Sequence, residues 1–581
     1  MGCNVKGFLR AGAIIWALVG GAAWPAAAAL PAGSPLLPQG SPLPRALPPP
    51  PPGVQPAAPA APLAVTTAMP NRPVPVRRIA IEGVTAYRPA RMAALTTGLV
   101  GPAVPLPRIE AAREAILRLY QGDGYVLTSV SASLDTHGTL RFLVTEGRIA
   151  SVKLSGDIGP AGTQVLRFLD RLTAVRPLTD AALERALLLA ESVPGVSLHA
   201  VLQPSTGTPG ALNLIAEVHR QVISGLITTD NYSSNYTGPY ESLAVFNLNS
   251  FTEFGDQTEI ALYHTWPNSE NFGQISEQVF LGGSGLRLKL YGGAGHTNPS
   301  GTLAEEGYLG VTEVYGARLS YPLLRSRQQS LEIYSSFDAV DSETSLDTGG
   351  VRTRANYDAL RVLRAGLEYA RTDLLAGPSR GALNAATFSV SHGLPILGAA
   401  RDGASDAPRI GERTDFVKVD FRLSRTQTLF EPWHDASVAL MGLVTGQWSP
   451  DIVPPAEEFY LGGFEYTRGY YAGQVSGDKG LAATAELQLN TPLDLHKLHL
   501  PEVVEAQFFA FYDWGETWQN QTAGLAIHLS SIGGGVRLSL TPHVELDLLG
   551  LHRFNVYPTG SGPTISALPG SAFYWRVLGR F

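Results

Sequence analysis

The chain of 581 residues is 44% apolar and 16% charged, a balance that suits neither a helical membrane bundle nor a disordered protein. Its formal net charge of −7 offers no basic surface for a nucleic-acid partner. Only eight of its 50 aromatic residues precede residue 221, so the C-terminal part has a different composition. Aromatic richness without a long apolar run is typical of membrane β-strands, because their alternating faces dilute the hydropathy.

The first 29 residues are predicted to be a secretory signal peptide. Lys6 and Arg10 precede an apolar run, and small residues supply a cleavage site near Ala29. Cys3, the only cysteine, lies before this run, which argues against lipoprotein processing and leaves the mature chain without cysteine. Residues 30–75 are predicted to be an extended proline-rich linker, because 16 of the 43 prolines fall between residues 31 and 75.

Two α/β domains with the same order of elements are predicted to follow, at residues 76–148 and 149–220. Each order is read from the spacing of apolar residues, and Pro107 is placed to begin the first long helix. Domains of about 70 residues are the economical reading of such a repeat. The first is expected to contain a strand at 76–81, a helix at 107–120 and strands at 125–133 and 139–145. The second is expected to contain a strand at 149–154, helices at 164–172 and 178–191, and strands at 196–203 and 212–219.

Residues 221–581 alternate apolar and polar side chains with a period of two. Between residues 417 and 424, four apolar residues alternate with Lys418, Asp420, Arg422 and Ser424. Charged residues opposite an apolar face indicate a water-filled interior. Allowing roughly 22 residues for a strand and its turn, this length corresponds to about 16 antiparallel strands, enough to leave a lumen. A soluble β-sandwich also alternates, but it does not need an aromatic C-terminus and a signal peptide together.

The glycine-rich stretch 461–470 is predicted to be a hairpin tip folded into a confined place. Its glycines allow positive φ angles, and Arg468 lies there between aromatic residues. A guanidinium in such a place needs a carboxylate. Asp513 is the candidate, because it lies in the aromatic strand 511–515 and would be costly to bury unpaired. The alternative is that Arg468 occupies a solvated turn.

Five motifs along the chain occur together in one known protein family. Two lie in the first α/β domain, at residues 117–130 and 140–149, and a third is Tyr-Pro-Leu-Leu-Arg-Ser-Arg at residues 321–327. The last two are Thr467-Arg468-Gly469-Tyr470, followed by the stretch 476–487, and Phe511-Tyr512-Asp513-Trp514-Gly515. By these motifs residues 76–581 resemble the two-partner secretion (TpsB) outer-membrane transporters, the ShlB/FhaC/HecB-type haemolysin secretion/activation family.

The resemblance implies a membrane β-barrel of about 16 antiparallel strands preceded by two periplasmic α/β POTRA domains, in the outer membrane of a Gram-negative bacterium. In that family the loop arginine reaches down the lumen to the strand aspartate. The matching positions here form a predicted lumenal lock between loop and strand: Arg468, Gly469, Tyr470, Phe511, Asp513 and Gly515. The family often carries an N-terminal helix that plugs the pore, and the proline-rich residues 31–75 depart from that pattern. Thr467 replaces the common valine, a change expected to be tolerated because both residues are β-branched.

The same resemblance implies export of an unfolded secreted partner, a TpsA-type exoprotein of the adhesin or haemolysin kind. The POTRA domains are expected to add the extended cargo as an extra strand at an exposed sheet edge. Membrane lipid is the other expected partner, with no cofactor, metal, nucleotide or nucleic acid. An outer-membrane assembly factor of the same superfamily is the alternative. Such factors commonly carry three to five periplasmic domains, whereas only two fit between residues 76 and 220.

An outer-membrane esterase is a further class to weigh. Residues 377–381 match the G-x-S-x-G string of α/β-hydrolases, but that motif must lead into a helix, whereas residues 382–391 read as a strand. We therefore predict no enzyme activity, and Ser379→Ala is the discriminating variant. His496 and His499 lack a third metal ligand nearby. One acidic run is expected to be a solvated loop rather than a calcium site: Asp338, Asp341, Glu343 and Asp347.

Overall fold

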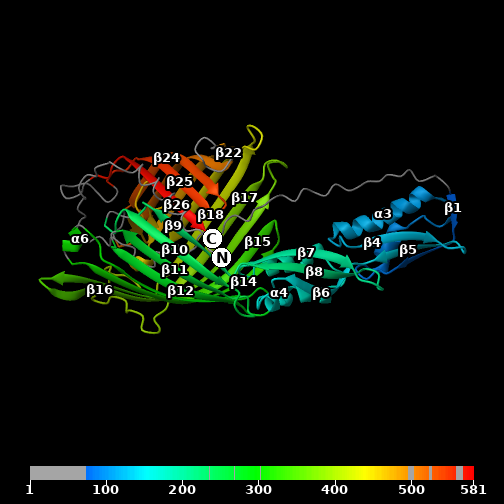
Figure 1. Cartoon of the computed structure of the whole chain (residues 1–581), viewed down its shortest axis with the longest axis horizontal. Helices are drawn as coiled ribbons and strands as arrows, with labels where there is room; N and C mark the ends of the chain where they lie inside the picture. Colours follow the sequence, from blue (N-terminus) through cyan, green and yellow to red (C-terminus); the bar gives the residue numbers. More distant parts are fainter. Residues whose placement is uncertain are drawn as a thin grey trace, which may run out of the picture.

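The computed structural model describes residues 73–581 apart from 234–235, 267, 301, 306, 495–502, 522–525 and 558–566. The predicted signal peptide, the linker up to residue 72 with any plug in it, and both His496 and His499 lie outside the described residues. Figure 1 shows a barrel with an arm of two α/β modules leading away from one of its mouths.

The first module is a three-stranded sheet in the order β2-β5-β4 covered by a long helix. Helix α3 has prolines at its start, where a missing N–H is harmless, and buries Ile109, Ile116 and Tyr120 on one face. A short ribbon β1-β3 and helix α2 were not predicted, and β1 begins within the expected linker. The elements are β1 (Pro73–Val76), β2 (Arg78–Glu82), α2 (Pro89–Leu95), β3 (Gly101–Pro105), α3 (Leu106–Gly122), β4 (Ser129–Leu134) and β5 (Thr139–Thr145).

Glu146 closes the first module. Its carboxylate accepts hydrogen bonds from the backbone N–H of Thr85 (2.8 Å) and Ala86 (3.0 Å) and from the Tyr120 hydroxyl (2.6 Å). Burial raises the pKa of Glu146, but the hydrogen bonds from Thr85 and Tyr120 outweigh it and leave the pKa below its usual value. Glu146 of the motif at residues 140–149 therefore has a structural role, because it ties the end of the last strand to the start of the module.

The second module repeats the sheet order as β6-β8-β7, with β6 parallel and β7 antiparallel to β8. Its predicted strands and helices are present. Helix α5 begins after Thr179, whose hydroxyl accepts the Ala182 N–H (3.3 Å). Among the described residues, no helix has the length and apolarity that a membrane crossing requires. The elements are β6 (Arg148–Gly156), α4 (Gly162–Leu169), η1 (Asp170–Ala174), α5 (Asp180–Glu191), β7 (Val196–Pro204) and β8 (Ala211–Arg220).

Sixteen antiparallel strands of the described chain close into one barrel, as predicted, with β26 pairing back to β9. Outward positions carry apolar side chains, such as the half-exposed Leu423, and inward ones carry polar groups, such as the buried Lys418. The strands are β9 (Ile223–Asp230), β10 (Tyr240–Asn249), β11 (Gln257–Trp266), β12 (Glu270–Phe280), β13 (Arg287–Thr297), β14 (Leu309–Arg325), β15 (Gln329–Thr348), β16 (Val351–Asp373), β17 (Ala382–Gly393), β18 (Val417–Phe430), β19 (Ser437–Trp448), β22 (Lys479–Leu493), β23 (Val504–Trp518), β24 (Ala526–Thr541), β25 (Val544–Arg553) and β26 (Ser571–Arg580).

The structure contradicts one prediction about a loop and agrees with another about a turn. The acidic run at residues 338–347 was expected to be a solvated loop, and this is wrong, because it lies within strand β15. Its acids face basic residues across the strands: Asp338 pairs with Arg364 (3.0 Å) and Asp341 with Arg361 (2.9 Å). The G-x-S-x-G string, in contrast, forms a turn that leads into strand β17 as predicted.

The second module is attached to the turns of the barrel. The Gln164 side chain donates to the Gly282 carbonyl (2.8 Å), in the turn between β12 and β13. In helix α5, Arg185 donates to the Pro322 carbonyl (2.6 Å), and Glu184 accepts the Arg327 N–H (2.8 Å). The motif at residues 321–327 therefore lies where the module meets the end of β14, beside the barrel mouth (Figure 1).

Candidate functional site in the barrel lumen

Residues 449–478, here called loop 6, join β19 to β22 and fold into the barrel. Within loop 6 the short helix η2 (Pro455–Glu457) precedes a ribbon of β20 (Phe459–Leu461) and β21 (Val475–Gly477). The tip begins with Gly462 and Gly463, which have φ angles of 100° and 101°. A Cβ atom at Gly462 would lie 1.9 Å from the Tyr471 carbonyl oxygen, so the tip requires glycine at this position.

Arg468 at the tip forms an ion pair with Asp513 on strand β23. Its Nε and Nη2 atoms each lie 2.9 Å from a different Asp513 oxygen, and its backbone N–H donates to the same carboxylate (2.8 Å). The guanidinium also lies 3.7 Å from the centre of the Phe511 ring. Both charged side chains are buried, at 5% and 0% exposure. A planar fork that meets two oxygens of one carboxylate is a contact that only arginine makes.

A second carboxylate, Glu486 of β22, completes the cluster. Arg468 Nη1 donates to it from one side, and Arg537 Nη1 donates to it from the other (2.7 Å). Arg537 stacks 4.0 Å from the centre of the Phe509 ring. Two arginines therefore balance two buried carboxylates. The sequence carried a signal for Glu486, since Thr484, Glu486 and Gln488 share the lumen face of β22 and alternate with Ala485 and Leu487, but its role was not assigned.

The remaining predicted lock residues lie around this pair. The Tyr470 hydroxyl donates to the Ser530 carbonyl (2.9 Å) and accepts the Asn555 N–H (3.1 Å). A Cβ atom at Gly469 would lie 2.6 Å from that of Ser531. At Gly515 a Cβ atom would lie 2.6 Å from a Leu461 methyl group, so glycine leaves room for loop 6. The structure thus brings Arg468, Gly469, Tyr470, Phe511, Asp513 and Gly515 together.

Thr467 contributes through its hydroxyl, a role that the motif alone does not indicate. The fully buried side chain accepts the Gly462 N–H (2.7 Å) and donates to the Tyr466 carbonyl (2.7 Å). The residue has a φ angle of 52°, a conformation that a β-branched residue rarely adopts. These two hydrogen bonds hold the tip in that conformation, and a valine would supply neither.

Glu457 attaches the incoming part of loop 6 to the opposite side of the lumen. Its carboxylate lies 2.9 Å from Lys418 Nζ of β18 and accepts a hydrogen bond from Arg364 Nη1 of β16 (3.0 Å). Arg364 in turn contacts Asp338. Glu457 and Lys418 are 1% and 0% exposed, so this is a buried ion pair. No sequence motif indicated it, because its members come from three separate segments.

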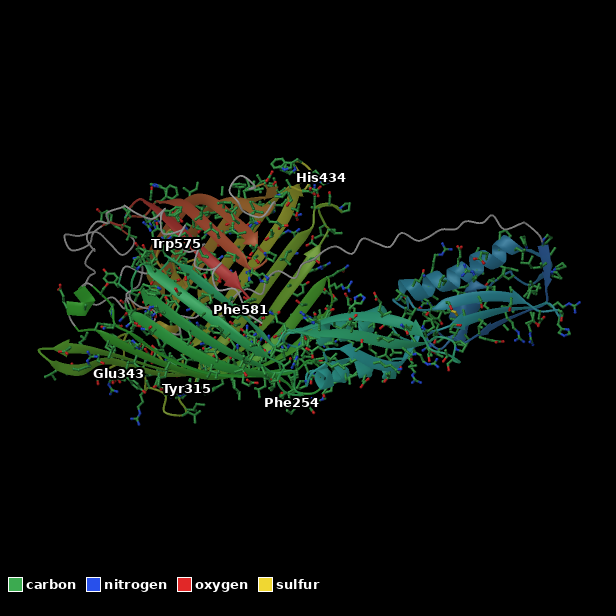
Figure 2. All side chains as sticks on the ribbon, in the orientation of Figure 1. Phe254, Tyr315, Glu343, His434, Trp575 and Phe581 are labelled. Carbon is green, nitrogen blue, oxygen red and sulfur yellow. The ribbon has the colours of Figure 1, made fainter. Side chains whose placement is uncertain are left out.

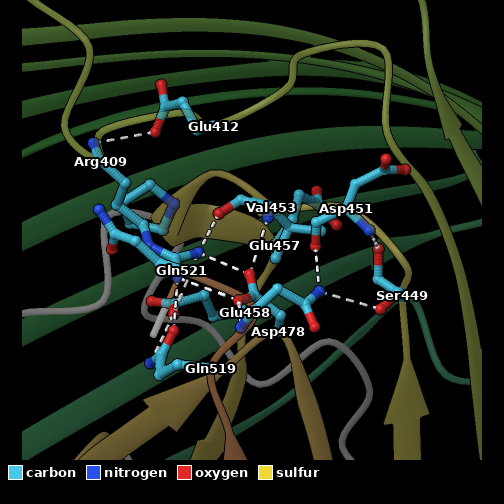
Figure 3. Close-up of polar contacts among 12 residues, drawn as sticks. Arg409, Glu412, Ser449, Asp451, Val453, Glu457, Glu458, Asp478, Gln519 and Gln521 are labelled. Atoms are coloured by element: carbon cyan, nitrogen blue, oxygen red, sulfur yellow. Dashed lines mark hydrogen bonds and ion pairs between the residues drawn. The ribbon is translucent and has the colours of Figure 1, made fainter. Parts of the chain in front are cut away.

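A third cluster ties loop 6 to its neighbours at the outer end of the barrel (Figure 3). Arg409, from residues 394–416 between β17 and β18, lies 2.7 Å and 3.2 Å from the two oxygens of Asp478. Asp478 also accepts the N–H groups of Val453 (2.8 Å) and Asn520 (2.6 Å). Among the described residues, no group of three or more His, Cys, Asp and Glu side chains is placed to hold a metal ion.

A closed barrel with a charged lumen, an inward-folded loop and α/β modules at one mouth defines an outer-membrane transporter with periplasmic POTRA domains. The chain belongs to the haemolysin secretion/activation protein family ShlB/FhaC/HecB, whose model matches residues 212–538. A model of the ShlB-type POTRA domain matches residues 74–147.

Named relatives and solved structures agree with this family. The chain is 24% identical to "Hemolysin transporter protein ShlB" of Serratia marcescens over 73% of each chain. It is 23% identical to "Outer membrane transporter CdiB" of Escherichia coli, over 87% of this chain and 82% of that protein. The fold is similar to that of CdiB from Escherichia coli, with a TM-score of 0.69, 17% identity and coverage of 89% and 92%. CdiB from Acinetobacter baumannii gives a TM-score of 0.62, with 16% identity and coverage of 88% and 91%.

Proposed function

We propose that this two-partner secretion transporter captures an unfolded protein at its POTRA domains and passes it through the lumen to the cell surface. The observation that carries the proposal is the attachment of the second module to the barrel, through Gln164 at the turn between β12 and β13 and Arg185 at the end of β14. A chain held on that module lies at the mouth of a polar lumen. No nucleotide is required, since folding of the exported chain outside supplies the direction.

Edge strands are the proposed capture sites. In the sheet orders β2-β5-β4 and β6-β8-β7, the outer strands each have one side without a sheet neighbour among the residues that the structure describes. An extended segment that pairs with such an edge gains backbone hydrogen bonds whatever its sequence. This mode suits a cargo that is recognised before it folds.

The proposed cargo is a TpsA-type exoprotein, either an adhesin or a haemolysin-like protein. A relative named as a haemolysin transporter supports this class. The outer face of the barrel meets lipid, and no nucleic acid takes part. We also propose that the protein is not an enzyme, a proposal supported by the turn at Ser379 that leads into a strand where a hydrolase needs a helix.

The lumenal lock is proposed to hold the tip of loop 6 during transport. Arg468 with Asp513 and Glu486 supplies the ionic contact, and Gly469, Tyr470 and Gly515 let the tip fit against the wall. Removal of either partner of such a buried ion pair leaves the other charge uncompensated, which strongly weakens the attachment of the tip.

Deletion of residues 76–219 tests the capture role. The shortened chain is expected to insert as a barrel, because strands β9–β26 and Phe581 remain, but to secrete no cargo. Surface labelling of the barrel and a blot for the exported cargo protein are the measurements. Cargo still reaching the medium would place recognition outside the two modules.

A further inference from the structure

Strands β16, β17 and β18 carry a row of polar residues on the outer face of the barrel, here called the outer polar row. Arg371 of β16 pairs with Asn384 of β17, which pairs in turn with Arg425 of β18. Residues that pair directly across strands point to the same face of the sheet. The next row on this face is apolar and consists of Tyr369, Ala386 and Leu423. Because arginine is costly to place in hydrocarbon, the outer polar row marks a boundary of the apolar belt.

This boundary lies at the end of the barrel that carries the POTRA modules. Arg371 also pairs with Gln329 of β15, which lies beside the turn that the second module contacts. Figure 2 labels His434, in the turn that joins β18 to β19, at this end of the barrel, and Glu343 of β15 at the opposite end. The outer polar row is therefore level with the phospholipid head groups that face the periplasm.

Arg371 is free to bind an anion, whereas Arg425 is partly occupied. The exposed Arg371 side chain makes no hydrogen bond or ion pair with the described residues. Arg425 Nη1 lies 2.9 Å from an Asp373 oxygen and 2.6 Å from the Asn384 side-chain oxygen. Its Nη2 atom also donates to Gln427, and its Nε–H has no acceptor in the described part of the chain. Asp373 balances one of the two arginines, so the row keeps one positive charge.

A hollow of about 440 Å³ opens in the outer wall beside Arg425. The outer polar row continues through Gly442 of β19 and Ala485 of β22 to Tyr512 of β23. These small residues form the floor of the hollow, and Leu423 and Tyr512 form its sides. A Cβ atom added at Gly442 meets no atom of the described chain within 4 Å. The hollow therefore has room for a stretch of an acyl chain.

The hollow lies deeper in the hydrocarbon than Arg371, because the strands tilt and the row crosses them at right angles. Strand β16 ends two residues beyond Arg371 on the periplasmic side. Strand β22 runs on for eight residues beyond Ala485 on the same side. An acyl chain that leaves a head group at Arg371 therefore passes toward the hollow.

We propose that this surface binds one phospholipid of the periplasmic leaflet, with the phosphate over Asn384 and an acyl chain in the hollow. Two strand spacings of about 4.8 Å separate Arg371 from Arg425, so a phosphate between them is within reach of both side chains. Guanidinium N–H groups match phosphate oxygens in geometry and charge. The remaining positive charge favours a head group that is anionic overall over one that is neutral. The site depends on the location of the barrel in the outer membrane and not on cargo transport.

Native mass spectrometry of the purified full-length protein tests the site, with phosphatidylglycerol as the anionic probe and phosphatidylcholine as the neutral one. The wild type is expected to retain one phosphatidylglycerol molecule in preference to phosphatidylcholine. Arg371→Gln is expected to lower the affinity for phosphatidylglycerol about tenfold, the change that follows from losing one charge-assisted contact. Arg352→Gln is the control, because it removes an exposed arginine near the other end of the same strand.

A second variant tests the hollow without changing any charge. Gly442→Leu fills the space of the acyl chain and is expected to lower retention of phosphatidylglycerol in a folded barrel, since leucine suits a lipid-facing position. Gly550→Leu is the control, because Gly550 is an exposed glycine of β25 whose added Cβ atom also meets no described atom within 4 Å. Heat-modifiable migration in gels shows that each variant has folded.

Three comparisons decide the outcome. Equal retention of both lipids by the wild type would indicate an unspecific lipid layer and would overturn the site. Equal affinity of the folded Arg371→Gln and Arg352→Gln barrels would overturn it too, as would equal retention by the folded Gly442→Leu and Gly550→Leu barrels. Cargo secretion is measured separately in cells, and its absence would contradict the proposed function alone.

Discussion

Arg468 shows how one side chain organises a loop that is surrounded by aromatic rings. Its guanidinium satisfies Asp513 and Glu486 at the same time, and the ring of Phe511 covers its face. The Arg468–Asp513 contact was predictable, because Arg468 is the one cation of the stretch 461–470 and Asp513 the one acid of the aromatic stretch 511–515. The Arg409 cluster was not, since Arg409 lies in a loop without periodicity and its partner is 69 residues further on.

Replacing the pair is expected to give non-additive losses. Arg468→Ala leaves the buried Asp513 without its cation, and Asp513→Ala leaves Arg468 with Glu486 alone, effects of roughly 3 to 5 kcal/mol, and the double variant is expected to lose far less than the sum. Arg468→Lys is expected to retain only part of the secretion, because an ammonium cannot meet two oxygens in one plane. The measurements are secretion and the temperature at which the barrel changes its gel migration.

A control cycle combines Arg468→Ala with Glu368→Ala, whose partner Arg318 (2.6 Å) lies on strand β14. These two losses are expected to add. Additive losses for Arg468 and Asp513 themselves would mean that the two residues act independently.

Thr467→Val is expected to destabilise the barrel although the two side chains are nearly isosteric. The change leaves the partly buried Gly462 N–H without the acceptor it has now, a loss of about 1 to 3 kcal/mol in the free energy of unfolding. Thr467→Ser keeps the hydroxyl and serves as the control. The melting temperature from gel migration is the readout, and a valine variant as stable as the serine variant would show that the hydroxyl is dispensable.

At the scale of elements, helix α5 connects the second module to strand β14. The contact uses Arg185 as donor to two consecutive carbonyls, those of Pro322 (2.6 Å) and Leu323 (3.3 Å). The helix and strand were each predictable from apolar periodicity, but their docking was not, since it depends on tertiary geometry. For the same reason the sequence pattern predicted a loop for the acidic residues of β15, although basic residues of β16 neutralise them across the sheet.

Arg185→Ala is expected to loosen the second module and to reduce secretion while leaving the barrel intact. The lost donor leaves two carbonyl groups at the junction without their charged partner, which weakens the docking of the module by about 1.5 to 3 kcal/mol. Limited proteolysis near residues 220–223, together with a cargo blot, measures the effect. Lys153→Ala, on an exposed position of the same module, is the control, and equal cleavage of both variants would contradict a docking role for Arg185.

At the scale of the whole molecule, the two ends of the barrel meet in its shortest seam. Strands β26 and β9 pair over five positions, from Arg576 opposite Asp230 to Arg580 opposite Leu226. Phe581 extends this seam with two backbone hydrogen bonds to Gly225, of 3.0 Å and 3.1 Å. The number of strands was predictable from length and periodicity. The strand lengths were not, because the end of each long strand extends beyond the membrane, where its outward face is no longer apolar.

Gly225→Ala is expected to weaken this seam. A Cβ atom there would lie 2.3 Å from the Val245 carbonyl oxygen and 2.6 Å from the Phe581 ring, and overpacking of this kind typically costs about 1 to 3 kcal/mol. Gly550→Ala is the matched control, since nothing lies within 4 Å of its added Cβ atom. Barrel assembly in cells and gel migration on heating report the difference, and equal stability of the two variants would show that the seam tolerates a side chain.

Strands β15 and β16 are 20 and 23 residues long. At about 3.3 Å per residue and a tilt of about 45°, β16 spans roughly 50 Å along the membrane normal, whereas the hydrocarbon core is about 30 Å thick. Figure 1 shows this hairpin reaching past the barrel at the end opposite the POTRA modules. In the described part of the chain, no atom lies within 4 Å of a Cβ atom added at its tip residues Gly349 and Gly350. An epitope inserted at these glycines would therefore stand above the lipid on intact cells, where an antibody reports barrel insertion without any exported cargo.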